Sequence, residues 1–221
     1  MGREISLLKP AFLSMPSHNQ KPILFAGLDH LNNPSMILEQ VFDFLNTCPK
    51  LENFVFYAPT SFYKDPFWDD SFYEQRLSTL YEIRSQSQCL TATNLGDYEN
   101  LENVSKVADI IIIDDYLCQM QKRVYNLMAL KKPMVLDVSL LSLNQVQELA
   151  QESVQKGCPV FFYFNQPQFD NQNFYHNFFC ASVFEENKIN PLKAGFYLGI
   201  KGFFTPFNPL WIKKVLEIFQ K

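Results

Sequence analysis

The sequence predicts an α/β fold built on a doubly wound parallel sheet, and three observations support this. Six short apolar runs alternate with amphipathic stretches between residues 22 and 165. The run from Asp109 to Ile113 is apolar on both faces, which is typical of a central strand covered by helices. Hydrophobic residues are 47% of the 221 residues and charged residues 19%, enough apolar surface for a sizeable core.

The six expected strands are short and rich in β-branched and aromatic residues. They lie at residues 22–26, 53–58, 88–93, 109–113, 133–136 and 159–164. Parallel strands of one sheet are joined by right-handed helical crossovers. The sequence therefore predicts a six-stranded Rossmann-like sheet in the order 3-2-1-4-5-6, with Ile110 to Ile113 at its centre.

The expected helices carry apolar residues at helical spacing. They cover residues 35–47, 71–81, 117–130 and 142–156. Ser142 with Gln145 three residues later predicts a capping box at the start of the last of these helices. Gly157 is placed to end it in a left-handed conformation.

The alternation changes after Asn165. We expect a loop or short helix over 166–190, then a long strand from Lys193 to Phe204 outside the parallel sheet. Asn208 and Pro209 are expected to begin a final helix. The predicted organisation is an N-terminal arm (1–21), a Rossmann-like domain (22–165) and the remnant of a C-terminal domain (166–221).

Composition excludes several classes of protein. A net charge of -4 and a pI near 5.4 argue against a nucleic-acid-binding protein. No apolar run reaches the roughly 18 residues of a membrane-spanning helix. The five cysteines form no C-x-x-C pair, and we expect reduced thiols in a cytoplasmic protein.

The chain resembles a known family in its order of motifs. The segment from Ala108 to Asp170 resembles the second half of the nucleotide-binding domain of Gfo/Idh/MocA oxidoreductases, and the resemblance extends over about residues 22–205. It implies a Rossmann fold, an NAD(P)-dependent oxidoreductase ancestry and NAD or NADP as the cofactor. The positions that carry it are Lys132-Pro-Met-Val-Leu136, Gln145-Val-Gln-Glu-Leu149, Gly157, and Asn165 with Phe169.

The departures from this family change the expected function. The family's E-K-P lysine is replaced, since the motif reads Asp137-Val138-Ser139. None of the seven glycines forms the G-x-G of a phosphate-binding loop. We therefore predict a pseudoenzyme, a non-catalytic binding or assembly protein. The alternative is an atypical NAD(P)-dependent oxidoreductase that uses Asp137, His30 or Tyr116 in place of the lysine.

Candidate ligand-binding residues follow the ends of the expected strands. Four aspartates gather there, and their charge would repel the two phosphates of a dinucleotide. An acidic rim instead suits a basic substrate or a cation, unless Asp115 caps the next helix and the others are solvated. No metal-ligand set is assigned. The candidate cofactor-binding residues are Gly27, Leu28, Asp29, Thr60, Asp114, Asp115, Ser139 and Asn165.

The C-terminal segment also predicts association. Phe196, Leu198 and Ile200 alternate in the expected strand, and one or two strands outside a sheet are marginal in water. The last helix can cover only one face of that strand. We therefore expect a homodimer, or a protein partner, that binds through residues 193–219, besides a small-molecule ligand.

Overall fold

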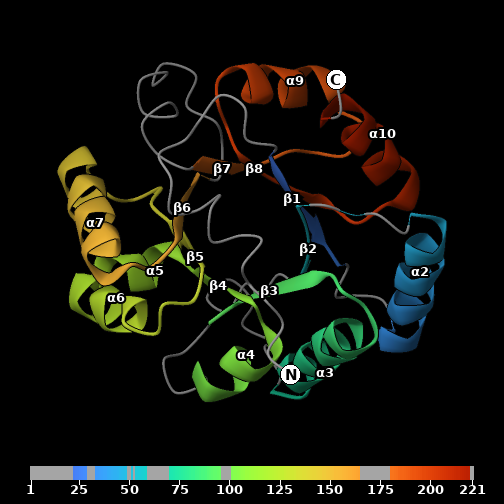
Figure 1. Ribbon diagram of the computed structural model, residues 1–221, viewed down its shortest axis with the longest axis horizontal. Helices are drawn as coiled ribbons and strands as arrows, with labels where there is room; N and C mark the ends of the chain where they lie inside the picture. Colours follow the sequence, from blue (N-terminus) through green and yellow to red (C-terminus); the bar gives the residue numbers. More distant parts are fainter. Residues whose placement is uncertain are drawn as a thin grey trace.

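A closed barrel of eight parallel strands forms the centre of the molecule, with helices around it (Figure 1). The computed structural model describes residues 22–28, 33–48, 51, 53–58, 70–95, 101–164 and 180–219. Each strand pairs with the next along the chain, and the last pairs with the first. The strands are β1 (Ile23–Gly27), β2 (Phe54–Ala58), β3 (Leu90–Asn94), β4 (Ile110–Ile113), β5 (Met134–Asp137), β6 (Val160–Phe164), β7 (Cys180–Val183) and β8 (Gly202–Pro206).

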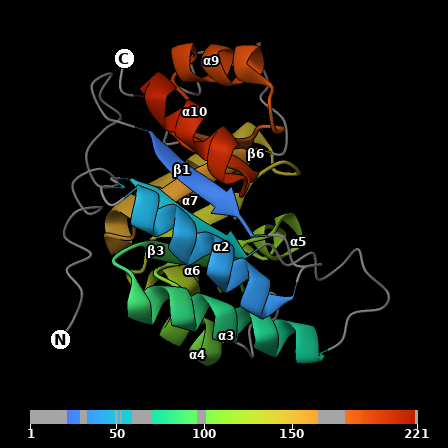
Figure 2. The same cartoon turned by 90° about the vertical axis from the view of Figure 1, so that its right-hand side faces the viewer.

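The described helices form the outer layer of the barrel: they lie between successive strands from β1 to β6 and between β7 and β8, and α10 follows β8. The connection from β6 to β7 lies outside the described residues. Figure 2 shows α2 between α10 and α3 on one side of the molecule. The described helices are α2 (Pro34–Thr47), α3 (Asp70–Gln86), α4 (Leu101–Val107), α5 (Asp115–Gln119), α6 (Gln121–Met128), α7 (Leu143–Lys156), α9 (Ile189–Tyr197) and α10 (Pro209–Phe219).

Local sequence signals are confirmed closely. All six expected strands are present, and the largest shift of an end is two residues (88–93 expected, Leu90–Asn94 found). Ser142 and Gln145 form the expected capping box, and Gly157 ends α7 with φ of 62°. The expected helix over 117–130 is two helices, α5 and α6, which meet at Met120.

The predicted fold class is wrong: the sheet is not a six-stranded, doubly wound Rossmann sheet but a closed eight-stranded barrel. β4 pairs with β3 and β5, whereas the expected order placed it beside β1. Both folds bury strands under helices and alternate β with α, so the hydrophobic pattern is the same in each. Closure depends on which strand β1 pairs with, and a local pattern carries no information about that.

The expected strand from Lys193 to Phe204 is also wrong. Residues Ile189–Tyr197 form α9, Gly199 turns the chain with φ of 91°, and β8 begins only at Gly202. A Cβ at Gly202 would lie 2.5 Å from the Cβ of Ala181, so glycine permits the close approach of β7 and β8. The expected division at residue 165 thus separated strands that the barrel unites.

The barrel interior is packed with side chains from every strand. Along β4, Ile110 and Ile112 point into the interior, while Ile111 and Ile113 pack against the helices. This arrangement explains why both faces of β4 are apolar, as in a central strand of an open sheet. The buried interior residues are Ile23, Phe25, Val55, Ala92, Ile110, Ile112, Val135, Phe161, Ala181 and Phe204.

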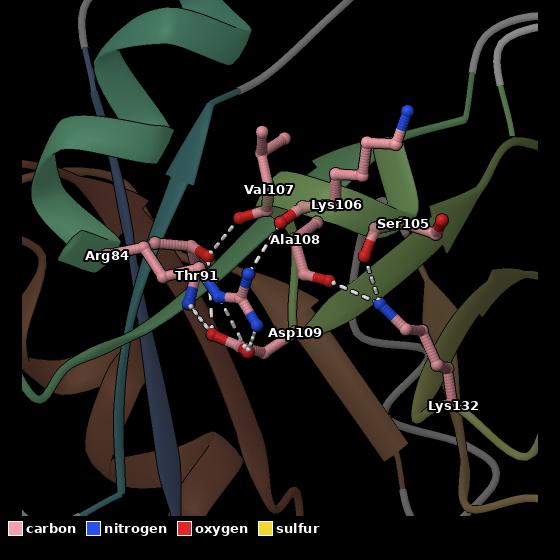
Figure 3. Close-up of polar contacts among 8 residues, drawn as sticks. All are labelled: Arg84, Thr91, Ser105, Lys106, Val107, Ala108, Asp109 and Lys132. Carbon is pink, nitrogen blue, oxygen red and sulfur yellow. Dashed lines mark hydrogen bonds and ion pairs between the residues drawn. The ribbon is translucent and has the colours of Figure 1, made fainter. Parts of the chain in front are cut away.

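A network of polar side chains lies at the N-terminal end of the barrel, where β3, β4 and β5 begin (Figure 3). The last carbonyls of α4 and the carbonyl of Ala108 accept hydrogen bonds from three side chains of other elements. Arg84 donates to Lys106, Thr91 donates to Val107 at 2.7 Å, and Lys132 donates to Ser105 and, at 3.0 Å, to Ala108. The last carbonyls of a helix lack partners within the helix, and the negative end of its dipole attracts cations. The network supplies hydrogen-bond donors to these carbonyls, and two of the donors, Arg84 and Lys132, are cationic.

Asp109 completes this network as the counter-ion of Arg84. Its carboxylate lies 3.1 Å from a guanidinium nitrogen of Arg84 and accepts from the backbone N–H of Thr91, also at 3.1 Å. Asp109 is buried, and the Arg84 side chain is 29% exposed. We name these four side chains, Arg84, Thr91, Asp109 and Lys132, the N-terminal network.

Candidate functional site

The C-terminal ends of all eight strands meet at one end of the barrel, which we call the mouth. In barrels of this architecture, ligands bind at this end because the loops that follow the strands converge there. A cavity of about 560 Å³ opens at the mouth, on the side of β7, β8 and β1. It is lined by Gly27, Leu28, Ile37, Gln40, Tyr57, Tyr163, Val183, Glu186, Phe204, Thr205, Pro206, Phe207 and Asn208.

Three aromatic rings form the floor of the cavity. Tyr57 and Tyr163 each approach Phe204 edge-to-face, with ring centroids 5.2 Å apart in both pairs. Phe204 stacks on Phe25, at 4.2 Å, and so rests on the packed interior of the barrel. Both tyrosines are the last inward-facing aromatic residues of their strands, which places their hydroxyl groups at the mouth.

The two tyrosine hydroxyls stay protonated at neutral pH. Burial raises the pKa of Tyr57 well above its usual range; the nearby Tyr163 and Asp137 raise it further, and the Arg76 guanidinium opposes them. Burial and Asp137 also raise the pKa of Tyr163. The Tyr57 hydroxyl donates to Oδ1 of Asn94 at 3.2 Å. Tyr57 and Tyr163 are therefore neutral hydrogen-bond donors.

Asp137 ends β5 and lies beside Tyr163, its paired position on β6. One of its oxygens, Oδ1, accepts from the backbone N–H of Ser139 at 3.0 Å and from the Ser139 hydroxyl at 2.6 Å. These contacts orient the carboxylate. Asp137 and Ser139, both predicted from the sequence, thus meet at the mouth.

Asp114 caps α5 and is only partly available to a ligand. It accepts from the backbone N–H of Leu117 at 2.9 Å. Burial raises the pKa of Asp114, as do Asp115 and Asp137, while the Leu117 N–H lowers it. One interpretation of the sequence named Asp115 as the cap of this helix, and it is wrong. The cap is Asp114, and Asp115 is the first residue of α5.

The structure separates the other predicted site residues. Gly27 and Leu28 line the cavity. Tyr116 is 49% exposed on α5 and does not line the cavity. Asp29, His30, Thr60 and Asn165 lie outside the described residues. Within the described residues, no group of three or more His, Cys, Asp or Glu side chains could hold a metal ion.

Glu186 and Asn208 form the wall of the cavity on the side of β7 and β8. Oε1 of Glu186 accepts from the side-chain amide of Asn208 at 2.8 Å and from that of Asn187 at 3.3 Å. Oδ1 of Asn208 accepts from the backbone N–H groups of Leu210 and Trp211, at 3.0 and 3.1 Å. The expected cap at Asn208 is thereby confirmed.

Tyr57, Tyr163 and Glu186 are not among the predicted site residues. Tyr163 lies within the expected strand 159–164, and Glu186 lies within the expected loop or short helix over 166–190. The available signal was the two-residue alternation along each strand, which puts Val55 and Tyr57 on the same face. Using that signal requires knowing that this face lines a barrel.

Comparisons with known proteins identify the fold and leave the family open. No family model and no curated protein matches the sequence. Among solved structures, a phospho-2-dehydro-3-deoxyheptonate aldolase (DAHP synthase) from Thermotoga maritima is similar, with a TM-score of 0.73 and 15% identity. The match covers 91% of this chain and 68% of that chain. At this identity, the likeness shows a TIM-barrel fold and no more.

These findings correct the expected family. The chain has the closed parallel barrel of the aldolase and not the Rossmann fold of Gfo/Idh/MocA oxidoreductases. The expected functions, a Rossmann-type pseudoenzyme or an NAD(P)-dependent oxidoreductase, lose their basis with that fold. The short motifs that carried the resemblance are a strand, a capped helix and a glycine turn, which both folds contain.

Among the described residues, no helix is both long and apolar enough to cross a membrane.

Proposed function

We propose that this chain is an enzyme that transfers a proton at the carbon next to a carbonyl group of a small organic substrate. The observation that supports it most is the arrangement at the mouth. Tyr57 and Tyr163, both with neutral hydroxyls, line a cavity of about 560 Å³. The oriented carboxylate of Asp137 is not among the residues that line this cavity, but it lies on β5 beside Tyr163. Paired groups of different acidity are typical of acid–base catalysis.

The proposed roles follow from the protonation states. The Asp137 carboxylate, oriented by Ser139, takes the proton as the carbon–hydrogen bond breaks. The electron pair of that bond forms a carbon–carbon double bond, and the π pair of the carbonyl moves onto its oxygen, which gives an enolate. Tyr163 donates a hydrogen bond to this oxygen as its charge develops, and Tyr57 does the same when its hydroxyl turns away from Oδ1 of Asn94. These bonds stabilise the transition state more than the substrate.

Two further points agree with this proposal. The similar structure is described as an aldolase, and aldol reactions as a class make or break a bond at a carbon next to a carbonyl group. The proposed step needs no redox cofactor; binding of NAD or NADP stays a prediction from the sequence. We also propose a cytoplasmic location, because all five cysteines are free thiols.

Exchange with solvent deuterium tests the proposal directly. The protein is incubated in D2O with a panel of 2-oxo acids, hydroxyketones and aminoketones, and NMR follows deuterium entering the carbon next to the carbonyl. We expect exchange with at least one compound, and Asp137→Asn should slow it by about 10²- to 10⁴-fold. The matched control is Asp43→Asn, at an exposed position of α2. No exchange with any compound, or full activity of Asp137→Asn, would overturn the proposal.

A further inference from the structure

The cavity combines aromatic rings with a carboxylate at its β7–β8 side. Four aromatic rings line the cavity, those of Tyr57, Tyr163, Phe204 and Phe207. The carboxylate of Glu186 is on the wall that follows β7. Aromatic rings attract cations through their electron-rich faces, and a carboxylate supplies a full negative charge. Together they have the composition of a site for an organic cation.

Glu186 is positioned to receive such a ligand. The side-chain amides of Asn208 and Asn187 both reach Oε1, and they fix the carboxylate without neutralising it because they are uncharged. A carboxylate has about four acceptor positions, so Oε2 retains capacity for a charged N–H donor. The neighbouring Glu185 has a different arrangement: it is 77% exposed and pairs with Lys188 at 3.6 Å.

The same wall disfavours an anion. A helix N-terminus usually attracts negative groups through its unsatisfied N–H donors. At α10, Oδ1 of Asn208 accepts from two of these donors, and Pro209 has no N–H to offer. Glu186, hydrogen-bonded to Asn208, adds a negative charge at the same place.

The other charges of the mouth lie elsewhere in the barrel. Arg76 acts on Tyr57, from α3, so its field opposes a cation near the Tyr57 hydroxyl. Asp114 and Asp137 lie on the β4–β5 side, where the proposed proton transfer takes place. A cation is therefore favoured at the Glu186 end of the cavity.

We propose that the β7–β8 side of this cavity binds the protonated amine of a small organic cation, with Glu186 as its counter-ion. The inference rests on the proposed function only in that the mouth is taken as the ligand site; combined with it, the substrate is an amine-bearing carbonyl compound. Tyr163, Phe204 and Phe207 form the apolar surroundings of the amine.

A pair of probes of equal shape tests the charge preference. Ethanolamine is titrated into the full chain at low salt, beside 1-propanol, which has the shape of ethanolamine with a methyl group in place of the ammonium. Calorimetry or NMR shifts give the dissociation constants. We expect ethanolamine to bind about tenfold more tightly than the neutral analogue, since a hydrogen bond from a charged donor to a carboxylate is stronger than one between neutral groups. Equal binding of the two, or no binding of ethanolamine, would overturn the inference.

Two matched variants locate the contact. Glu186→Gln keeps an oxygen for Asn208 and removes the charge, so it should weaken ethanolamine binding by about tenfold or more. Glu185→Gln should leave binding unchanged, because that carboxylate pairs with Lys188. If the two variants behave alike, Glu186 is not the counter-ion and the inference is wrong.

The experiment also separates this inference from the proposed function. Asp137→Asn should slow deuterium exchange by about the same 10²- to 10⁴-fold and still bind ethanolamine, because the two carboxylates lie on different sides of the mouth. Ethanolamine binding without any exchange by the parent protein would refute the proposed reaction and support the cation site. Deuterium exchange without cation binding would support the proposed reaction and refute the cation site.

Discussion

The two ends of the barrel use polar side chains in opposite ways. In the N-terminal network, Arg84, Thr91 and Lys132 donate to carbonyls at the end of α4, and Asp109 neutralises Arg84. At the mouth, Tyr57, Tyr163 and Glu186 line a cavity. Polar groups that satisfy one another contribute to the free energy of unfolding, whereas groups that face a cavity are available to a ligand. The difference separates a stabilising end from a binding end, and each substitution below tests it.

The largest effect on stability is expected from Asp109→Ala. The substitution leaves the guanidinium of Arg84 without its buried counter-ion and removes the acceptor for the Thr91 N–H. We expect a loss of about 3 kcal/mol in the free energy of unfolding, measured by urea denaturation. Glu102→Gln, in an exposed pair with Lys106, is the control and should change little. A loss below 1 kcal/mol for Asp109→Ala would mean that the N-terminal network is not stabilising.

Lys132→Met should have the next largest effect. The ammonium group donates to the carbonyls of Ser105 and Ala108, and methionine keeps most of the apolar stem. Losing both hydrogen bonds should cost about 2 kcal/mol, since each is worth about 1. Burial lowers the pKa of Lys132, as does Arg84, which shows that its charge is held at some cost. Lys131→Met, at an exposed position next to it, should leave the urea midpoint unchanged.

Alkaline pH should lower the free energy of unfolding through groups at both ends of the barrel, and the pH at which the loss begins differs between the two ends. Burial raises the pKa of Cys158, near the N-terminal end, from 9.0 to about 12. Its contribution to stability is complete below pH 9 and is lost as pH rises toward 12, because the unfolded chain releases the proton first. Tyr57 and Tyr163 at the mouth also contribute stability that is lost as pH rises, but only from about pH 10 upward, since the pKa of each is raised above 10.0.

Cys158→Ala isolates the thiol in this alkaline decline. Relative to its own stability at pH 8, the variant should lose about 1 kcal/mol less than the parent at pH 10. Urea denaturation at pH 8, 9 and 10 gives both curves. Parallel curves would show that the thiol does not contribute to the pH dependence.

Tyr57→Phe should have the smallest effect on stability. The variant loses one hydrogen bond, to Asn94, and keeps the ring that contacts Phe204, so we expect a change of about 1 kcal/mol or less. Deuterium exchange should nevertheless fall, because the hydroxyl holds the developing enolate. Tyr81→Phe, at a side chain 56% exposed on α3, is the control. A large loss of stability with unchanged exchange would assign Tyr57 to the fold instead of the site.

Local structure could be predicted from this sequence, and closure of the barrel could not. The strands and the caps at Ser142, Gly157 and Asn208 depend on neighbours a few residues away, and they were predicted well. β7 was missed because Cys180, Ala181 and Ser182 are small, so Val183 alone carries a β-branched apolar signal in this strand. The pairing of Ile23 with Gly202 joins segments far apart in the chain, and the tight contact of Gly202 with Ala181 became interpretable only in the structure.

The candidate site was predicted in part for the same reason. Asp137, Ser139, Gly27 and Leu28 were identified because they follow strands, and strand ends gather in an open sheet and in a barrel alike. Tyr57 and Tyr163 lie inside their strands, so only the inward face of a closed barrel brings them to the mouth. Association through residues 193–219 stays a prediction, although Ile200, one of the residues that motivated it, is buried within the chain itself, as are Phe203 and Phe204.

The pairing of β1 with β8 has a consequence for synthesis on the ribosome. A nascent chain emerges N-terminus first, so β1 can pair with β2 early and yet lacks its other neighbour until Gly202–Pro206 has been made. Until then, an apolar strand edge stays open to other chains. The growing polypeptide thus passes through a long interval in which the open edge of β1 can pair with another chain instead of with β8.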